Sequence, residues 1–334
     1  MPNTRCRRIT AGAAIAASLF VHKAVAGLYP GMSNLNHTCS LVDPILSCSS
    51  GASDPSAVDT CCTETFGGLV LATQFWNTYT GFESEGQVLP KDAWTLHGTL
   101  PSPRTVSPPT KEKTKNGLST TPSPHPTPRP ARRTGRPSPA WRGPDFGTFL
   151  APLGKLDLLA WMGVHWVAQP GWRNGDFWGH EFSKHATCYS TFDIECYGPQ
   201  YREHEEVADF FETAAAFHRR LPTWAWLEAS GVRPSNASTF SLADFARPLT
   251  QGFGAVPYIG CAGPKYNTTD AGKGSSDAGY TVINEIWYYY HVYGRVQRQQ
   301  GLAVDANITG GRLTNCAQTP GALHYYERTA GSEV

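Results

Sequence analysis

Apolar residues follow two different patterns along this chain, one typical of strands and one typical of helices. Residues 67–76 (GGLVLATQFW) and 281–294 (TVINEIWYYYHVYG) are rich in β-branched and aromatic side chains, which predicts strands. Apolar positions recur at helical spacing over 154–169 and 201–221, and Pro222 ends the second run. Helices in the middle of the chain with strands on both sides predict an α+β domain.

A third helix is predicted over DFWGHEFSKHATC (176–188), with Asp176 as its N-cap. At about 100° per residue, His180, Glu181, Lys184 and His185 fall within roughly 140° of one another and share one face. That face is either a solvated charged surface or the lining of a cleft. The cleft is favoured because neighbouring aromatic residues would anchor the helix in a core: Phe177, Trp178 and Phe182.

The polar face suits metal-free acid–base chemistry better than zinc chemistry. His180 and Glu181 open the zinc motif H-E-x-x-H, but position 184 is a lysine where the motif needs histidine. Cleaving RNA through its 2′-hydroxyl needs a base, an acid and a cation beside the phosphorus. Histidines suit the first two roles because their pKa lies near working pH, and Lys184 suits the third. Glu181 could orient a histidine or stabilise the transition state.

Such a reaction needs one more histidine, on the opposite side of the cleft from this helix. The stretch AWTLHGTLP (93–101) supplies His97 at the end of a short strand-like run. A lone histidine in that setting is more often structural, and the residues around it do not decide the matter.

The N-terminus predicts export. Within residues 1–26, three arginines at 5, 7 and 8 precede an apolar run over 11–21 and an A-V-A cleavage site at 24–26, as in a secretory signal peptide. The apolar run is too short to span a bilayer, so a membrane anchor is not expected. Eight cysteines remain after cleavage, and export makes disulfides the expected state. Four N-x-[ST] sequons suit a secreted glycoprotein: Asn36, Asn236, Asn267 and Asn307.

One long segment, residues 99–145, differs in composition from the rest of the chain. Between Thr99 and Pro144 it holds twelve prolines, nine Lys or Arg and a single acid. It cannot bury enough apolar surface to fold and is predicted to be disordered. Its basic charge could contact RNA phosphates, but a solvated linker is the favoured interpretation. The net charge of the whole chain is only +1, so any nucleic-acid binding must come from a local site.

Two stretches resemble the active-site segments of the ribonuclease T2 family. WTLHG (94–98) is similar to W-T-I-H-G-L-W-P, and FWGHEFSKHATC (177–188) is similar to F-W-x-H-E-W-x-K-H-G-T-C. The resemblance covers about 38–98 and resumes near 146, which makes 27–98 and 146–334 two parts of one ribonuclease domain. It implies an α+β fold with a central antiparallel β-sheet flanked by helices. It also implies metal-independent cleavage of single-stranded RNA through a 2′,3′-cyclic phosphate, without a cofactor.

Roles follow from the resemblance position by position. His97 would be the general acid and His185 the general base, with Glu181 and Lys184 stabilising the transition state. His180 would bind phosphate. Phe177 and Gln74 fall where the family forms its second base pocket, in which an aromatic face accepts several bases. The implied disulfides pair Cys39 with Cys62, Cys61 with Cys196, and Cys261 with Cys316.

The sequence departs from the family after Gly98. The family continues with Leu-Trp-Pro-Asp and a nearby cysteine, which help form its first base pocket, whereas here the proline-rich segment begins. Cys48 and Cys188 lose the partners that the resemblance implies, and would pair with each other or stay free. Residues 99–145 are then either a frameshifted or mis-spliced translation or a divergent insertion.

The favoured function is a secreted monomeric endoribonuclease, extracellular or in a vacuole- or lysosome-like compartment, that acts on single-stranded RNA and does not bind a membrane. The alternative is a catalytically impaired secreted relative that binds RNA or acts as a toxin-like defence protein. This alternative follows if residues 99–145 are native and distort the cleft.

Overall fold

The computed structural model describes residues 39, 41, 43–47, 49–52, 57–64, 69–102, 146–266, 278–308 and 310–334. The predicted signal peptide, residues 103–145 of the proline-rich segment, Cys48 and two of the sequons, Asn36 and Asn267, lie outside these residues. The other two sequon asparagines, Asn236 and Asn307, are exposed. Among the described residues, no helix has both the length and the apolar character needed to cross a bilayer.

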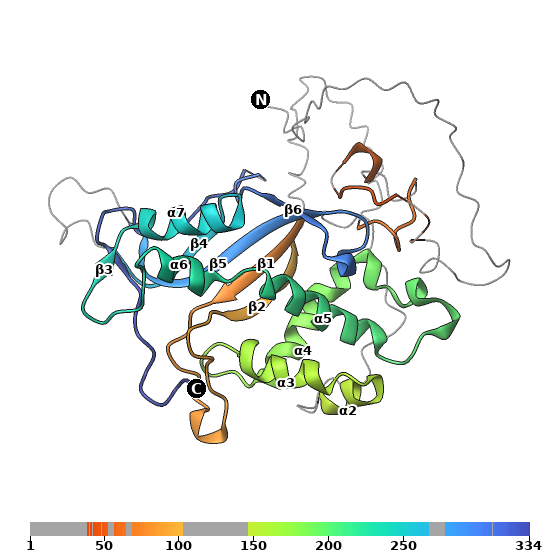
Figure 1. The fold of residues 1–334 in the computed structure, drawn as a ribbon, viewed down its shortest axis with the longest axis horizontal. Helices are drawn as coiled ribbons and strands as arrows, with labels where there is room; N and C mark the ends of the chain where they lie inside the picture. The colour runs from red at the N-terminus through yellow and green to blue at the C-terminus, as the bar shows by residue number, and fades with distance from the viewer. Residues whose placement is uncertain are drawn as a thin grey trace, which may run out of the picture.

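A seven-stranded sheet forms the centre of the molecule (Figure 1). Its order is β2-β1-β5-β7-β3, and β4 and β6 also pair with β5. The pairs are antiparallel except for a short parallel contact between β5 and β7. The strands are β1 (Leu69–Phe75), β2 (Thr95–Ser102), β3 (Thr239–Phe240), β4 (Tyr258–Lys265), β5 (Tyr280–Val292), β6 (Gly301–Val304) and β7 (Leu323–His324).

Six α-helices and several short 3₁₀ helices accompany the sheet in the described part of the chain, which confirms the predicted α+β class. The α-helices are α2 (Gly147–Leu150), α3 (Leu156–His165), α4 (Asn174–His185), α5 (Glu205–Arg219), α6 (Thr223–Ala229) and α7 (Leu242–Phe253). The two strands and the helices predicted from periodicity are present as β1, β5, α3 and α5. β1, α3 and α5 are a few residues shorter than their apolar runs, and β5 begins one residue before its run and ends two residues before the end of that run.

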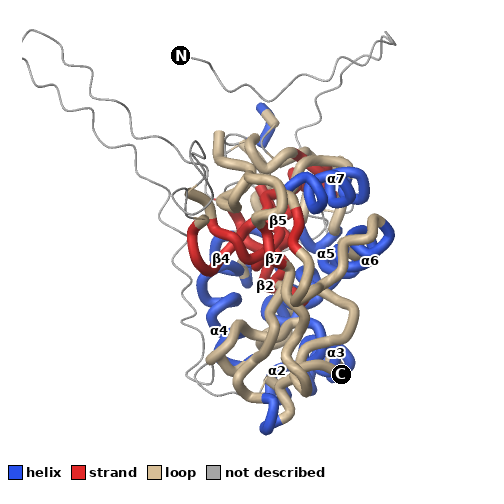
Figure 2. Tube along the Cα trace, turned by 90° about the vertical axis from the view of Figure 1, so that its left-hand side faces the viewer, coloured by secondary structure: helices blue, strands red, loops and turns tan. Residues whose placement is uncertain are grey.

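The two faces of the sheet are covered differently. Figure 2 shows α5, α6 and α7 on one side of the strands, where Phe217, Trp226 and Phe253 pack against Tyr288 and Tyr290 of β5. The other face carries a smaller cluster, formed by Leu69, Leu71, Tyr289 and Ala306 with Tyr258, Trp287 and Val304 packed against it. Because successive side chains of a strand point to opposite faces, the sheet separates two polar sites described below.

A β-bulge at His97 interrupts the pairing of β1 with β2. Thr73 is opposite Gly98 and Gln74 is opposite Leu96, so His97 is the extra residue. His97 lies on the same face of the sheet as Phe75, whose ring it stacks on, and its Nε2 lies 3.6 Å from Glu181 of α4. Strand β2 continues to Ser102, so the first four residues of the segment predicted to be disordered belong to the sheet.

The start of α4 differs from the prediction. The helix begins at Asn174 with the extended Arg173 before it, and Asp176 lies in the first turn instead of at the N-cap. The reason is a set of contacts from outside the helix: Gln87 Oε1 accepts the Asn174 backbone N–H at 3.0 Å, and Asn174 Oδ1 accepts that of Ala168 at 2.9 Å. Asp176 keeps a favourable place beside the positive end of the helix dipole.

The three disulfides implied by the resemblance are present: Cys39–Cys62, Cys61–Cys196 and Cys261–Cys316. The second closes a loop of 135 residues and ties the N-terminal segment to the 3₁₀ helix Ile194–Gln200. Long closed loops restrict the unfolded chain most, so this bridge is expected to contribute about 3–5 kcal/mol. Cys188 is exposed and forms no disulfide with another described cysteine.

A buried carboxyl group, Glu64, fastens the same N-terminal segment. Its Oε1 accepts hydrogen bonds from Ser190 N at 3.1 Å and Ser190 Oγ at 3.3 Å, and its Oε2 contacts Thr191 Oγ1 at 3.2 Å. Burial raises the pKa of Glu64 to about 7, and the hydrogen bonds oppose that shift only in part. The folded protein therefore binds this proton more tightly than the unfolded chain does.

We expect the Glu64 site to weaken the fold as pH rises. The pKa of Glu64 is about 7 in the folded protein, and its ordinary value is 4.5. As pH rises between these two values, the free energy of unfolding should fall by roughly 3 kcal/mol, and it should level off at higher pH. Glu64→Gln mimics the protonated form and should remove this part of the slope, measured by urea unfolding at pH 5 and pH 8. Glu203→Gln, at a side chain 84% exposed, is the matched control. Equal slopes in wild type and Glu64→Gln would contradict the assignment.

Candidate active site

His97 is held from two sides by aromatic residues. Its ring stacks on Phe75 with centroids 4.0 Å apart, and its backbone oxygen accepts the Trp166 Nε1–H at 2.7 Å. Its Nδ1 is buried without a hydrogen-bond partner, and 21% of the side chain is exposed. These contacts leave Nε2 as the atom that faces α4.

Glu181 joins His97 to His185. Its Oε1 lies 3.6 Å from His97 Nε2 and 3.9 Å from His185 Nε2, so both imidazoles approach the same oxygen. The Glu181 side chain is fully buried, and neither oxygen has a hydrogen-bond partner within the described structure. Both distances are too long for hydrogen bonds, yet they place the two ring nitrogens within reach of the oxygens of one phosphate group.

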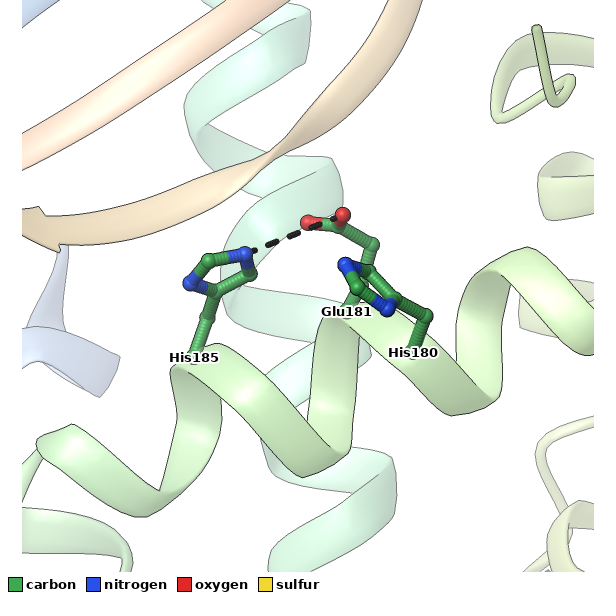
Figure 3. A group of neighbouring side chains, drawn as sticks. All are labelled: His180, Glu181 and His185. Atoms are coloured by element: carbon green, nitrogen blue, oxygen red, sulfur yellow. Dashed lines mark ion pairs between the residues drawn. The ribbon is translucent and has the colours of Figure 1, made fainter.

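The remaining predicted groups lie beside this pair. Figure 3 shows His180, Glu181 and His185 on one side of α4, as their spacing predicted. The His180 ring is 6.1 Å from that of His185. Burial lowers the pKa of both His180 and His185, and the charge of the exposed Lys184 adds to both shifts. The structure therefore brings together His97, Glu181, His185, His180 and the charge of Lys184.

Burial favours the neutral form of each central group. It lowers the pKa of His97 to about 3 and that of His185 to about 4, and nearby positive groups add to both shifts. Burial also raises the pKa of Glu181 well above its ordinary value. Burial thus favours a neutral imidazole at His185 and disfavours the charged carboxylate at Glu181.

A metal ion is the alternative occupant. The candidate ligand atoms of His180, Glu181 and His185 all lie within 4.8 Å of one another. Two features oppose a cation: the ammonium of Lys184 adjoins the group, and burial keeps the proton on Glu181, which a metal ligand must lose. The donor set could hold a metal, but the surrounding charge does not favour one.

The two residues predicted to bind the second base have separate locations. The Phe177 ring lies 5.8 Å from that of His97, with an angle of 28° between the planes. The side chain of Gln74 points to the opposite face of the sheet from that of Phe75. It is fully buried beside α5, where its Nε2 donates to Leu221 O at 3.0 Å. Gln74 and Phe177 therefore lie apart in the absence of RNA, and the role of Gln74 in a second base pocket stays a prediction.

Trp172 was missed by the sequence analysis. It is 46% exposed, and its ring lies 5.6 Å from His180 and 6.5 Å from Phe177. Gln87 Nε2 donates to its backbone oxygen at 2.8 Å, and the neighbouring Arg173 pairs with Glu85 and lies over the Phe82 ring. The sequence does offer one sign of an exposed aromatic residue here, because Trp172 directly follows Pro-Gly and lies outside any periodic apolar run.

Comparison with known proteins agrees with this geometry. The model of the Ribonuclease T2 family matches residues 67–304. Ribonuclease Trv of Hypocrea rufa is 30% identical over 247 residues, which are 74% of this chain and 84% of the relative. Ribonuclease Le2 of Lentinula edodes is 29% identical over 252 residues, 75% of this chain and 83% of the relative.

A solved structure shares the fold. The crystal structure of Actibind, described as a T2 ribonuclease, superposes with a TM-score of 0.57 at 24% sequence identity. The alignment covers 86% of this chain and 97% of Actibind.

Proposed function

Because the chain belongs to the ribonuclease T2 family and is an endoribonuclease of that type, we propose that it cleaves single-stranded RNA without a metal, by acid–base transphosphorylation through a 2′,3′-cyclic phosphate. The observation that carries the proposal is the approach of His97 and His185 to one oxygen of Glu181. Two imidazoles on either side of a phosphate are what this reaction needs, because one must take a proton while the other gives one.

In the proposed first step His185 acts as the base. It removes the proton of the 2′-hydroxyl, whose oxygen then bonds to phosphorus, and the 5′-oxygen leaves with a proton from His97. Burial holds the pKa of His185 at about 4, so the base stays neutral in mild acid. Binding of the phosphate anion beside His97 raises the pKa of that imidazole, because an opposite charge stabilises the protonated form.

The other groups stabilise charge on the phosphorus. The protonated Glu181 can donate a hydrogen bond to a non-bridging phosphate oxygen, since its carboxyl has no other partner in the described structure. Lys184 and His180 add positive charge and a donor at the exposed side. In the second step water attacks the cyclic phosphate, His97 takes its proton and His185 returns one to the 2′-oxygen.

The test is product analysis at pH 4 to 6 on a single-stranded oligonucleotide. We expect 2′,3′-cyclic phosphate ends, with the rate unchanged by a chelator. RNA that is retained but never cut would instead support the alternative, an impaired RNA-binding relative, which the altered sequence after Gly98 motivates. A rate lost with chelator and restored by zinc would reject the metal-free mechanism.

We propose that Trp172 supplies a base platform beside Phe177. Stacking on an aromatic side chain contributes about 1–3 kcal/mol per base, so Trp172→Ala should raise KM for RNA by about tenfold while kcat changes little. Tyr293→Ala, at another exposed aromatic, is the control and should leave KM unchanged. A fall in kcat at constant KM would show that Trp172 acts on the chemical step instead.

We also propose export as a monomeric glycoprotein. The signal-like residues 1–26, the three disulfides and the exposed sequon asparagines Asn236 and Asn307 support an oxidising, secretory route. Secretion places the protein outside the cell or in a vacuole- or lysosome-like compartment, where a base of low pKa suits acidic conditions.

A further inference from the structure

A cavity of about 350 Å³ lies on the α5 side of the sheet, apart from the two histidines that carry the proposed reaction. Its walls come from β1, the loop before β2, and helices α3, α5 and α6. His97, Glu181, Lys184 and His185 are absent from the lining. Its size falls within the range of small-molecule sites. The residues that matter below are Gln74, Trp161, His165, His218, Arg219 and Trp224.

Two polar side chains that contact each other, Gln74 and His218, line this cavity. Gln74 Nε2 donates to Leu221 O at 3.0 Å and to His218 Nδ1 at 3.1 Å. The Leu221 carbonyl fixes the orientation of the amide, so Nδ1 of His218 accepts and its Nε2 carries the proton. Gln74 Oε1 is buried with no partner in the described structure, on a side chain only 1% exposed. An unsatisfied buried acceptor of this kind requires a donor.

Indole rings form the flat walls. The Trp161 ring lies 5.0 Å from His165 and 5.6 Å from His218, and Trp224 is stacked on Trp76 at 5.5 Å. At the mouth, the exposed guanidinium of Arg219 lies 4.7 Å from the centre of the Trp161 ring. The cavity thus combines flat apolar faces, a donor–acceptor pair and an external positive charge.

We propose that this cavity is a second nucleotide site, in which a base stacks on Trp161, its edge bonds Gln74 and His218, and its phosphate meets Arg219. Adenine and cytosine each carry an amino donor beside a ring-nitrogen acceptor, and adenine has the larger ring to stack on Trp161, so adenine fits best. The ligand is either a free mononucleotide of the kind an endoribonuclease releases or a base of bound RNA. The choice of ligand rests on the proposed function, whereas the site itself does not.

The test is calorimetric titration of the whole protein with adenosine 3′-monophosphate. We expect two sites in wild type. Trp161→Leu should weaken one by tenfold or more, and Trp172→Leu, beside His180, should weaken only the other. Arg219→Gln, a surface change that leaves the core intact, should weaken binding of the nucleotide but not of adenosine, which has no phosphate. A single site that Trp172→Leu weakens and Trp161→Leu leaves unchanged would overturn the inference.

An uncleavable 2′-deoxyadenosine oligonucleotide separates the two sources of the ligand. If the cavity takes a base of bound RNA, Trp161→Leu lowers the affinity for the oligonucleotide as well as for the mononucleotide. If the cavity takes free nucleotide, Trp161→Leu lowers only the affinity for the mononucleotide. Binding at this site with no RNA cleavage would reject the proposed function alone. Normal cleavage with a single binding site, which Trp172→Leu weakens and Trp161→Leu leaves unchanged, would reject this inference alone.

Discussion

Replacing either His97 or His185 by alanine is expected to lower kcat/KM for RNA by about 10²- to 10⁴-fold, the usual contribution of one positioned acid or base. Each imidazole reaches the same Glu181 oxygen, and no other described histidine approaches it within 4.0 Å. The effects should not multiply in the double variant, because the two residues act as one unit. The measurement is initial cleavage rate on a fluorescent oligonucleotide.

The control for these histidine variants is His324→Ala. His324 lies in β7, whose neighbours are β3 and β5, and its ring stacks on Tyr326. Its loss removes an imidazole without touching α4 or β2, so the rate should stay near that of wild type. A His97 or His185 variant that keeps more than about a tenth of the activity would contradict the assignment of acid and base.

Replacing Glu181 by leucine should act in opposite directions on stability and on activity. The carboxyl is fully buried and both oxygens lack hydrogen-bond partners within the described residues. Such a group costs about 1–3 kcal/mol, so Glu181→Leu should raise the free energy of unfolding by that amount. Because the donor to phosphate is lost, kcat should fall by about 10²- to 10³-fold.

Glu181→Gln is the matched control for this variant. The amide keeps a donor at the same place and a similar volume, so activity should lie between wild type and Glu181→Leu. Urea unfolding and kcat are measured on all three proteins. A leucine variant that is less stable than wild type would mean that the buried carboxyl supports the fold, and the proposed compromise between stability and activity would then be wrong.

The candidate site could be predicted from the sequence where its geometry is local. The shared face of His180, Glu181, Lys184 and His185 follows from helical periodicity alone, and α4 shows it. The approach of His97 could not be derived in this way, because it depends on the packing of β2 against α4, which are far apart in sequence. Only the resemblance to a family connected the two segments.

The features that the sequence did not predict share one cause, which is contact between residues far apart in the chain. Asp176 has the chemistry of an N-cap, but Gln87, which is distant in sequence, fixes the helix start at Asn174. Gln74 matches a family position, yet contacts with Leu221 and His218 hold its side chain on the other side of the sheet from Phe75. Trp172 lies outside any periodic apolar run. Its position is set by a loop that Gln87 and Glu85, distant in sequence, hold through contacts with Trp172 and Arg173.

The most direct test of the proposed mechanism is a crystal structure with an uncleavable 2′-deoxydinucleotide. We predict that its phosphate lies between β2 and α4, with one oxygen within about 3.2 Å of His97 Nε2 and another within the same distance of His185 Nε2. A phosphate bound to only one of these histidines, or bound elsewhere on the protein, would contradict the account.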